Sequence, residues 1–364
     1  MSLLVLSGSD VDQVVSHFGL NELVDLMAQV FLAFPRPGNA FYEKNLYVPE
    51  RMRVLSWNHH TLFMPVRAAD LGGSAVKIVS VPSESAPEDI KERGLPASTM
   101  VLDETTGEVA AVVNACKLTA LRNAASSLLA TRLLGPKTPQ RILAIGAGAQ
   151  IAAHLSLFLS QYPSITSCEV FNRTYNARMQ GLISDLGSKF AGRVLIYGHT
   201  LYAENGTPNP DLERLVREAD IIITATSSTT PLFPSAYVKP GAHLCLIGSY
   251  RPVMHEIDTD LVKRAGRVVV DYRAGALSEA GELISAGLKQ DDVFELGELI
   301  SHPDVMRLAR GWVPDKAVIE TARSGGDVTI FKSVGVSVQD IAIANAVVQK
   351  AKQLGVGTVV EGYQ

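Results

Sequence analysis

The sequence predicts an α/β protein in which a domain built on a parallel sheet is inserted into a second, discontinuous domain. The length of 364 residues suits two domains at ~100–200 residues each. Short strand-like segments precede residue 114, whereas strands alternate with helical patterns from Arg141 onward, which is typical of a parallel sheet. The last segment, from residue 322, is too short to fold alone, so we expect it to complete the first domain.

Composition excludes several classes of protein. Apolar residues make up 47% of the chain, which is enough for a large core and too much for a disordered protein. The 33 basic and 37 acidic residues give a net charge of −4 without a basic block, so nucleic acid and anionic membranes are not expected partners. Three scattered cysteines indicate no disulfide framework and no metal site, and the N-terminus does not resemble a signal peptide. We therefore expect a cytoplasmic protein without a membrane span or a bound metal.

The first third of the chain shows mixed patterns. Apolar residues at helical spacing predict a helix from Asp10 to Phe34. Turn residues at Asp103–Gly107 predict a hairpin, and a run of good helix formers predicts one long helix from Asn114 to Leu134. Antiparallel, meander-like strands are expected between these helices, at 53–56, 62–66, 74–79, 98–103 and 108–113.

The inserted domain is predicted over residues 123–321. Its expected strands are 141–145, 167–171, 193–197, 220–225, 242–247 and 267–271. Helical patterns separate the first four strands, at 149–162, 174–190 and 210–218. Strands joined by helices pair in parallel through right-handed crossovers, so these units predict a Rossmann-type sheet. Residues 1–122 and 322–364, the latter with a short strand at 328–331 and a helix at 338–352, would form the other domain.

A glycine-rich loop follows the first strand of the inserted domain. Gly146 allows a tight turn, and Gly148 lets the backbone approach a pyrophosphate at the start of the next helix. Ile151 stands where this fingerprint usually has a third small residue, and an ordinary turn is the alternative interpretation. We interpret the loop as a dinucleotide site made by five consecutive residues: Gly146, Ala147, Gly148, Ala149 and Gln150.

The end of the second strand indicates which dinucleotide is bound. NAD-binding proteins usually place an acid there to bind the ribose 2′-hydroxyl, but this chain has Asn172, Arg173 and Thr174. Arg173 can bind a 2′-phosphate, so the sequence favours NADP(H), with NAD(H) as the second choice. The alternative interpretation is an exposed arginine before a helix that Thr174 caps.

A polar cluster follows the fourth strand of the same domain. Thr226 and Ser227 come after residues 220–225, at the carboxyl end of a strand, where open α/β sheets bind ligands. We therefore count both as candidate cofactor contacts. An ordinary polar loop is the alternative interpretation.

Three cations stand among apolar residues: Arg53, Lys77 and Arg122. A buried, unpaired charge is costly, so each of them needs an anionic partner. A shared site for a substrate carboxylate is one answer, and an internal salt bridge for each cation is the other. Spacing alone favours the internal salt bridges.

Motifs in the same order resemble the ornithine cyclodeaminase/mu-crystallin family. The resemblance covers residues 50–350 and rests on these segments: Gly94–Pro96, Leu102–Gly107, Leu118–Ser126, Gly146–Gln150, Asn172–Thr174, Lys239–His243, Ile247–Gly248 and Phe331–Gly335. It implies a nicotinamide cofactor, amino-acid or imino-acid substrates, and a homodimer formed through the sheet of the split domain. It also implies that Arg53, Lys77 and Arg122 hold the substrate, which reverses the weighting from spacing alone, and that Gly248 and Ser333 contact the cofactor.

Two positions separate the chain from ornithine cyclodeaminases. The family's amine-handling acid corresponds to Tyr250, and a second acid corresponds to Leu62. The Gly248-x-x-Arg251-Pro252 pattern resembles mu-crystallin, whose relatives reduce ketimines with NADPH. We therefore predict an NADP(H)-dependent oxidoreductase that reduces the C–N bond of a small, cyclic imino acid. The alternatives are a redox-neutral ornithine- or lysine-type cyclodeaminase, an amino-acid dehydrogenase, and a non-catalytic, NADPH-dependent binding protein.

The predicted mechanism gives each candidate residue a role. Arg53 and Arg122 would bind the substrate carboxylate and fix the imine carbon at near-attack distance. Lys77 would contact the carboxylate or the imine nitrogen and stabilise or supply the proton. Tyr250 would either donate a proton or narrow the pocket.

Overall fold

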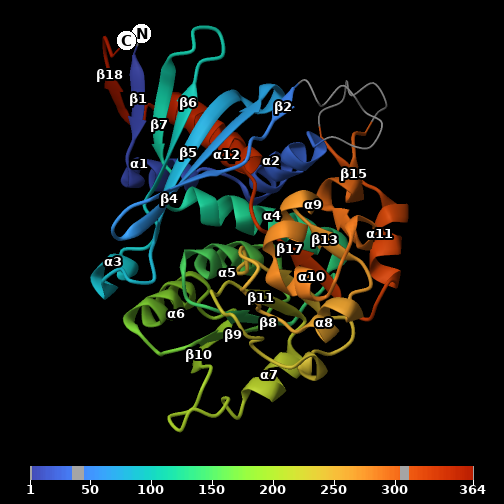
Figure 1. Cartoon of the computed structure of the whole chain (residues 1–364). Helices are drawn as coiled ribbons and strands as arrows, with labels where there is room; N and C mark the ends of the chain where they lie inside the picture. Colours follow the sequence, from blue (N-terminus) through green and yellow to red (C-terminus); the bar gives the residue numbers. More distant parts are fainter. Residues whose placement is uncertain (1, 35–44, 304–310, 364) are drawn as a thin grey trace. The chain divides into compact units, whose positions relative to one another are not determined.

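A computed structural model describes residues 2–34, 45–303 and 311–363 (Figure 1). The chain divides into two compact units, with residues 1–122 and 336–364 in unit 1 and residues 123–335 in unit 2. The sequence places the second boundary at 321/322, and the structure moves it to 335/336. The reason is that strand β17 (Thr329–Lys332) pairs with β12 (His243–Leu246) and β13 (Val268–Val270), and so belongs to the sheet of unit 2.

Unit 1 is built on a sheet in the order β18-β1-β7-β6-β5-β4-β2, with β3 paired to β4. The pairing of β1 with β7 is parallel and the other pairings are antiparallel. The predicted meander corresponds to β3–β7, but the sequence does not predict β1 and β18, because such short segments carry little periodic signal. The strands are β1 (Leu3–Leu6), β2 (Leu46–Tyr47), β3 (Met52–Leu55), β4 (His59–Ala68), β5 (Gly73–Pro82), β6 (Ala97–Leu102), β7 (Val109–Asn114) and β18 (Thr358–Val360).

Helices cover part of this sheet. The single helix expected over residues 10–34 is two helices, α1 (Gly8–Val15) and α2 (Leu20–Leu32), because the chain leaves the helical path before Gly19, the N-cap of α2. Helix α12 (Ser337–Leu354) packs against β4, β5 and β6, and most of its first three turns is buried. The other helical elements of unit 1 are η2 (Ala69–Leu71), α3 (Glu88–Glu92) and the start of α4 (Leu118–Leu134).

Unit 2 contains a fully parallel sheet in the order β10-β9-β8-β11-β12-β17-β13-β14. The six strands predicted from residue 141 onward correspond to β8–β13, and the predicted α/β fold is confirmed. The strand order reverses between β8 and β11, and open α/β sheets bind ligands at such a point, beyond the carboxyl ends of the strands. The strands not yet defined are β8 (Arg141–Ile145), β9 (Ser167–Asn172), β10 (Leu195–Thr200), β11 (Ile221–Thr224) and β14 (Val293–Glu295).

The central strands of unit 2 are mostly apolar, as expected for a sheet that is covered on both faces. Residues 221–223 in β11 and 244–246 in β12 are fully buried. None of the described helices has the length and hydropathy to cross a bilayer. The remaining elements are α5 (Ala149–Gln161), α6 (Ala177–Lys189), α7 (Leu212–Glu218), η3 (Ser235–Tyr237), α8 (Thr259–Arg264), α9 (Arg273–Glu279), α10 (Gly281–Ser285), η4 (Gln290–Asp292), η5 (Leu296–Leu299), β15 (Ile300–Ser301), β16 (Val313–Pro314) and α11 (Lys316–Ser324).

Candidate functional site

The glycine-rich loop joins β8 to α5 at the point where the strand order reverses. Gly146 has a φ of +118°, and a Cβ there would lie 2.8 Å from the carbonyl oxygen of Ala225, so only glycine fits. Gly148 is the N-cap of α5, and no side chain of the described residues caps this helix. A Cβ at Gly148 would meet no described atom within 4 Å, apart from those of its chain neighbours and of the helix backbone. Oε1 of Gln150 is buried and has no hydrogen-bond partner among the described residues. An open, uncapped helix N-terminus presents free backbone N–H groups, which fits the pyrophosphate of a dinucleotide. Oε1 of Gln150 is an acceptor, so it would pair with a donor group of a ligand and not with the pyrophosphate.

Residues 172–174 lie at the carboxyl end of β9, where a Rossmann-type site recognises the 2′ substituent of a dinucleotide. The side-chain amide of Asn172 donates a hydrogen bond to the carbonyl oxygen of Thr174, at 2.9 Å, and Arg173 is exposed. Helix α6 is capped by the side chain of Asn176, so the alternative in which Thr174 caps it is wrong. An exposed guanidinium beyond the carboxyl end of β9 can donate two parallel hydrogen bonds to a phosphate.

Two loops border the carboxyl ends of β11 and β12, and one buried carboxylate holds both of them. Oε1 of Glu256 accepts hydrogen bonds from the backbone N–H of Thr226, at 2.7 Å, and from its hydroxyl, at 2.9 Å. Oε2 of Glu256 accepts from the backbone N–H of Gly248, at 2.7 Å. Ser227 is exposed beside Thr226. The predicted cofactor residues of these loops therefore have a shared anchor that the sequence did not reveal.

The other two predicted residues of unit 2 lie at the same end of the sheet. Tyr250 is half-buried, and its ring centroid lies 5.9 Å from the guanidinium carbon of Arg251. Ser333 is buried at the end of β17, and its hydroxyl donates to Oδ2 of Asp271, at 2.7 Å. The hydroxyl proton of Ser333 is thus committed to Asp271, and its oxygen can still accept a hydrogen bond from a ligand.

Within unit 1, the structure brings Lys77 and Arg122 together around a carboxylate. Lys77 on β5 places its Nζ 2.6 Å from Oδ2 of Asp340, and Arg122 on α4 places its Nε 3.2 Å from Oδ1. Nη1 of Arg122 also donates to Oε1 of Gln339, at 2.6 Å. The three charged side chains are only 3–4% exposed. Internal ion pairs are therefore present, and the two cations and one anion that form them carry a net charge of +1.

Electrostatics set the protonation of this cluster. Burial lowers the pKa of Lys77 below its usual value, and Asp340 opposes the shift, while the charges of Arg122 and Arg51 add to it. A lysine whose pKa is lowered by burial gives up its proton more readily than a free one. Such a group is suited to donating a proton to a substrate.

The structure places Arg53 apart from this pair. Arg53 lies on the exposed strand β3, and its Nη2 is 2.8 Å from Nδ1 of His60. Lys77 pairs with Met64 in the sheet, and the register of β3 on β4, extended by one residue, brings Arg51 level with Met64. Arg51, two residues before Arg53, is thus the arginine of this strand that lies in line with Lys77.

Sequence reasoning missed several residues of these sites. Asp340 and Gln339 stand at the start of a predicted helix, Glu256 lies in the segment after a predicted strand, and Asp271 is the last residue of another. For Asp340 a signal exists, because an acid between apolar residues of a buried helix is the anion that a buried cation needs. Among the described residues, no group of three or more His, Cys, Asp or Glu side chains is placed to hold a metal ion.

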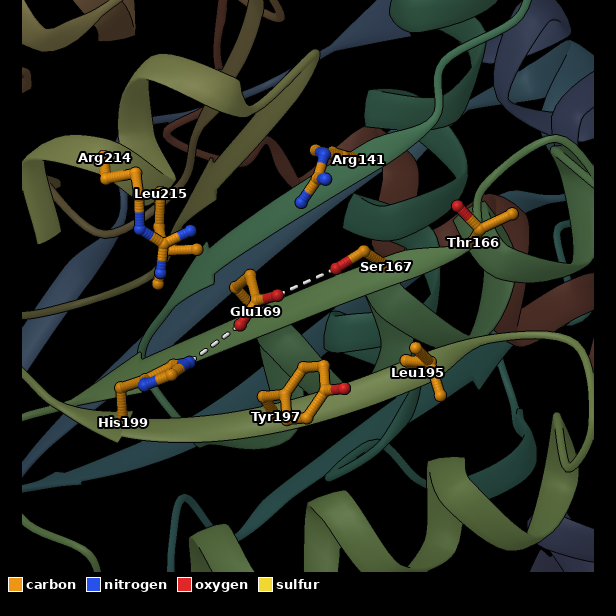
Figure 2. Close-up of a pocket in the computed structure, with 9 residues that line it drawn as sticks. All are labelled: Arg141, Thr166, Ser167, Glu169, Leu195, Tyr197, His199, Arg214 and Leu215. Atoms are coloured by element: carbon orange, nitrogen blue, oxygen red, sulfur yellow. Dashed lines mark hydrogen bonds and ion pairs between the residues drawn. The ribbon is translucent and has the colours of Figure 1, made fainter. Parts of the chain in front are cut away.

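A separate concavity of about 460 Å³ lies on one face of the unit 2 sheet, beside α7 (Figure 2). Glu169 lies at its centre, accepting a hydrogen bond from Ser167, at 2.8 Å, and pairing with His199, at 2.7 Å. Two of its arginines, Arg141 and Arg214, pair with Glu218 and so already have anionic partners. The concavity lies on the side of the strands and not at their carboxyl ends, so we do not assign it to the dinucleotide. Its lining residues are Arg141, Thr166, Ser167, Glu169, Leu195, Tyr197, His199, Arg214 and Leu215.

Comparison with known proteins gives a consistent set of relatives. Residues 9–355 match the model of the ornithine cyclodeaminase/mu-crystallin family. A Delta(1)-pyrroline-2-carboxylate reductase of Bacillus cereus is 30% identical over 366 residues, which cover 99% of this chain and 100% of that protein. Ketimine reductase mu-crystallin of Mus musculus is 32% identical over 252 residues, which cover 69% of this chain and 68% of that protein. The solved structure of Thermococcus litoralis Delta(1)-pyrroline-2-carboxylate reductase with NADH and L-proline has a TM-score of 0.76 and 25% identity, covering 98% of this chain and 99% of that one.

Proposed function

The chain belongs to the ornithine cyclodeaminase/mu-crystallin family and is an NAD(P)-dependent oxidoreductase, and on this premise we propose that it reduces a small, cyclic imino acid with NADPH. The observation that carries the proposal is the buried cluster of Lys77, Arg122 and Asp340, which has one more positive than negative charge. Burying a net charge is unfavourable, and a ligand carboxylate placed beside the two cations would offset it. The ketimine named in two of the relatives, pyrroline-2-carboxylate, carries a carboxylate on its imine carbon.

The reaction adds a hydride to the imine carbon and a proton to the imine nitrogen, and converts the ketimine into a cyclic amino acid. A bound, reduced nicotinamide supplies the hydride. Arg122 would bind the substrate carboxylate and restrict its orientation, because its guanidinium is already fixed by Asp340 and Gln339. Lys77 would donate the proton, since burial lowers its pKa. A protonated imine is the better hydride acceptor, so cationic Lys77 must not be the only partner of the nitrogen; Tyr250 is a second candidate donor.

The third carboxylate ligand in this proposal is Arg51 and not Arg53. Arg51 is half-buried and close enough to Lys77 for its charge to lower the pKa of that lysine. Arg53 is exposed beside His60. The two arginines form a matched pair: Arg51→Met should raise KM for the imino acid, and Arg53→Met should leave it unchanged. Equal effects of both substitutions would remove Arg51 from the site.

The preference for NADPH is supported by residues 172–174. No acid ends β9, and the exposed Arg173 can pair with a 2′-phosphate. The Thermococcus litoralis relative was solved with NADH, so the preference is a property that must be measured on this chain. A higher kcat/KM with NADH than with NADPH would overturn this part of the proposal.

We also propose that the protein is a cytoplasmic homodimer that pairs through unit 1. Around β3, large apolar side chains are exposed: Met52 is 60%, Leu55 65% and Trp57 97% accessible to solvent. Contiguous apolar side chains of this size on a surface mark an interface. The free thiols Cys116, Cys168 and Cys245 fit a reducing compartment. Light scattering should give twice the chain mass for the wild type and a smaller mass for Trp57→Glu; a monomeric wild type would contradict the proposal.

A substrate screen tests the proposed reaction. Cyclic ketimine carboxylates with five- and six-membered rings are mixed with NADPH or NADH, and loss of the reduced nicotinamide is followed by its absorbance. We expect one NADPH to be consumed for each ketimine reduced. A cyclodeaminase would also convert a diamino acid such as ornithine, offered with a catalytic amount of NAD(P), into a cyclic amino acid and ammonia without net consumption of the dinucleotide, and a binding protein would oxidise no NADPH with any substrate.

Lys77→Met is the matched variant for this screen. It should abolish turnover, because it removes the proton donor, and leave NADPH binding intact, because Lys77 belongs to unit 1. Retained turnover would remove Lys77 from the mechanism.

A further inference from the structure

Buried carboxylates lie beneath the loops at the carboxyl ends of β11 and β12. Glu256 and Glu282 are both fully buried, and so is Lys332, whose Nζ lies 3.5 Å from Oε1 of Glu282. Two acids and one base leave this group with an excess of negative charge within a polar network. Burying a net negative charge is energetically unfavourable, so each carboxylate must accept hydrogen bonds from neighbouring donors.

The donors of Glu256 come from two different loops. Thr226 in the loop after β11 donates twice, and Gly248 in the loop after β12 donates once. The carboxylate thus bridges two segments that are 22 residues apart in the sequence. Its three bonds all come from N–H or O–H groups, which is the pattern that fits an ionised carboxylate.

The two loops also touch each other directly. A Cβ at Gly248 would lie 2.0 Å from the carbonyl oxygen of Thr226 and 2.5 Å from Oε1 of Glu256, so no side chain fits there. The neighbouring Ser249 donates from its hydroxyl to Oε2 of Glu282. Two consecutive residues of one loop are therefore held by two buried carboxylates, immediately before Tyr250.

The geometry points to Glu256 as a positioning residue that fixes the separation of the two loops and so forms the nicotinamide end of the dinucleotide site. In a Rossmann-type sheet, one half of the dinucleotide lies over β8 and β9 and the other half over the strands beyond the reversal of strand order, here β11 and β12. The hydrogen bonds of Glu256 go only to the loops after β11 and β12, which border the second half of the site. This inference rests on the dinucleotide binding in the proposed function and adds a residue that acts through Thr226 and Gly248.

Binding measurements on the full chain test the inference. NADPH probes both halves of the site, and 2′,5′-ADP probes only the adenosine half near residues 172–174. Glu256→Ala should raise the Kd for NADPH by at least about tenfold, as expected for loss of charge-assisted hydrogen bonds, and leave the Kd for 2′,5′-ADP unchanged. Glu256→Gln should lie between, because a glutamine has one acceptor oxygen and can hold only one loop. If the wild type prefers NADH, then NADH and AMP replace the two probes.

Glu169→Gln is the matched control. Like Glu256, Glu169 is a buried glutamate of unit 2, but it lies in strand β9. Its partners, Ser167 and His199, belong neither to the loop after β11 nor to the loop after β12 (Figure 2). This variant should bind both probes like the wild type. If Glu256→Ala does not fold, Gly248→Ala tests the same point, because its Cβ would clash with Thr226 and with Oε1 of Glu256 and so force the two loops apart.

The outcomes separate this inference from the proposed function. Equal loss of NADPH and 2′,5′-ADP binding would show a general structural role for Glu256 and overturn the inference, as would unchanged NADPH binding in Glu256→Ala. A wild type that binds the dinucleotide but reduces no ketimine would overturn the proposed reaction alone. A wild type that binds no dinucleotide would overturn both.

Discussion

Replacing Asp340 by Asn tests the excess positive charge in unit 1. The substitution removes the carboxylate that pairs with both Lys77 and Arg122, whose side chains are only 3–4% exposed. Removing one partner of a buried ion pair costs about 3–5 kcal/mol. One kcal/mol lowers the Tm of a folding unit of ~150–250 residues, the size of unit 1, by about 2–4 °C. Asp340→Asn should therefore lower the Tm of unit 1 by roughly 6–20 °C.

Lys77→Met is the opposite perturbation of the same cluster. It leaves Arg122 and Asp340 as a balanced pair and removes a charge whose burial is unfavourable, as the lowered pKa of Lys77 shows. Its free energy of unfolding should therefore stay within about 1 kcal/mol of the wild type. Thermal unfolding followed by circular dichroism measures both variants. Equal losses of Tm in the two variants, or an unchanged Tm in Asp340→Asn, would refute the argument that this cluster carries one positive charge too many.

Three further predictions follow from the same structure. Lys77 loses its proton as pH rises through its lowered pKa, and the neutral amine neither binds a carboxylate nor donates a proton. The kcat/KM for the ketimine should therefore fall at high pH, and a flat pH profile would exclude Lys77 as the proton donor. Arg173→Ala should reduce the preference for NADPH over NADH by at least about tenfold, and an unchanged ratio would show that Arg173 does not bind the 2′-phosphate. Burial lowers the pKa of His154 to about 4 and of His243 to about 3, from 6.5 in an unfolded chain. Folded protein therefore binds fewer protons below pH 6.5 and should lose about 1.4 kcal/mol per pH unit for each histidine as pH falls; urea unfolding at pH 7 and pH 5 measures this, and equal free energies would contradict it.

The inserted sheet could be predicted because its strands are buried on both faces. Segments such as Ile221–Ile223 are continuous apolar runs, and helical patterns separate them, so both their type and their parallel pairing follow from the sequence. The position of β17 could not be predicted in the same way. It comes after β13 and β14 in the chain but lies between β12 and β13 in the sheet. Hydrophobic periodicity identifies a strand but does not indicate which other strands it pairs with.

The cation site illustrates a different limit. Arg51 and Arg53 are two residues apart, so they share one face of a strand, and alternation cannot distinguish them. Only the register of β3 on β4 brings Arg51 level with Lys77. Arg122 and Asp340 are 218 residues apart, and no local pattern connects them, although the need of a buried cation for an anion does indicate that such a partner exists.

The most direct test of the account compares two substrates that differ only in the carboxylate. The rate of NADPH oxidation by Delta(1)-pyrroline-2-carboxylate is measured against that by the same ring without its carboxylate. Because only the first substrate has a carboxylate that can pair with Lys77 and Arg122, we predict one NADPH consumed per ketimine and a kcat/KM at least about 100-fold lower for the second. Equal kcat/KM values for the two rings, or no oxidation of NADPH by either, would contradict the central claim that this cluster binds the carboxylate of an imino acid.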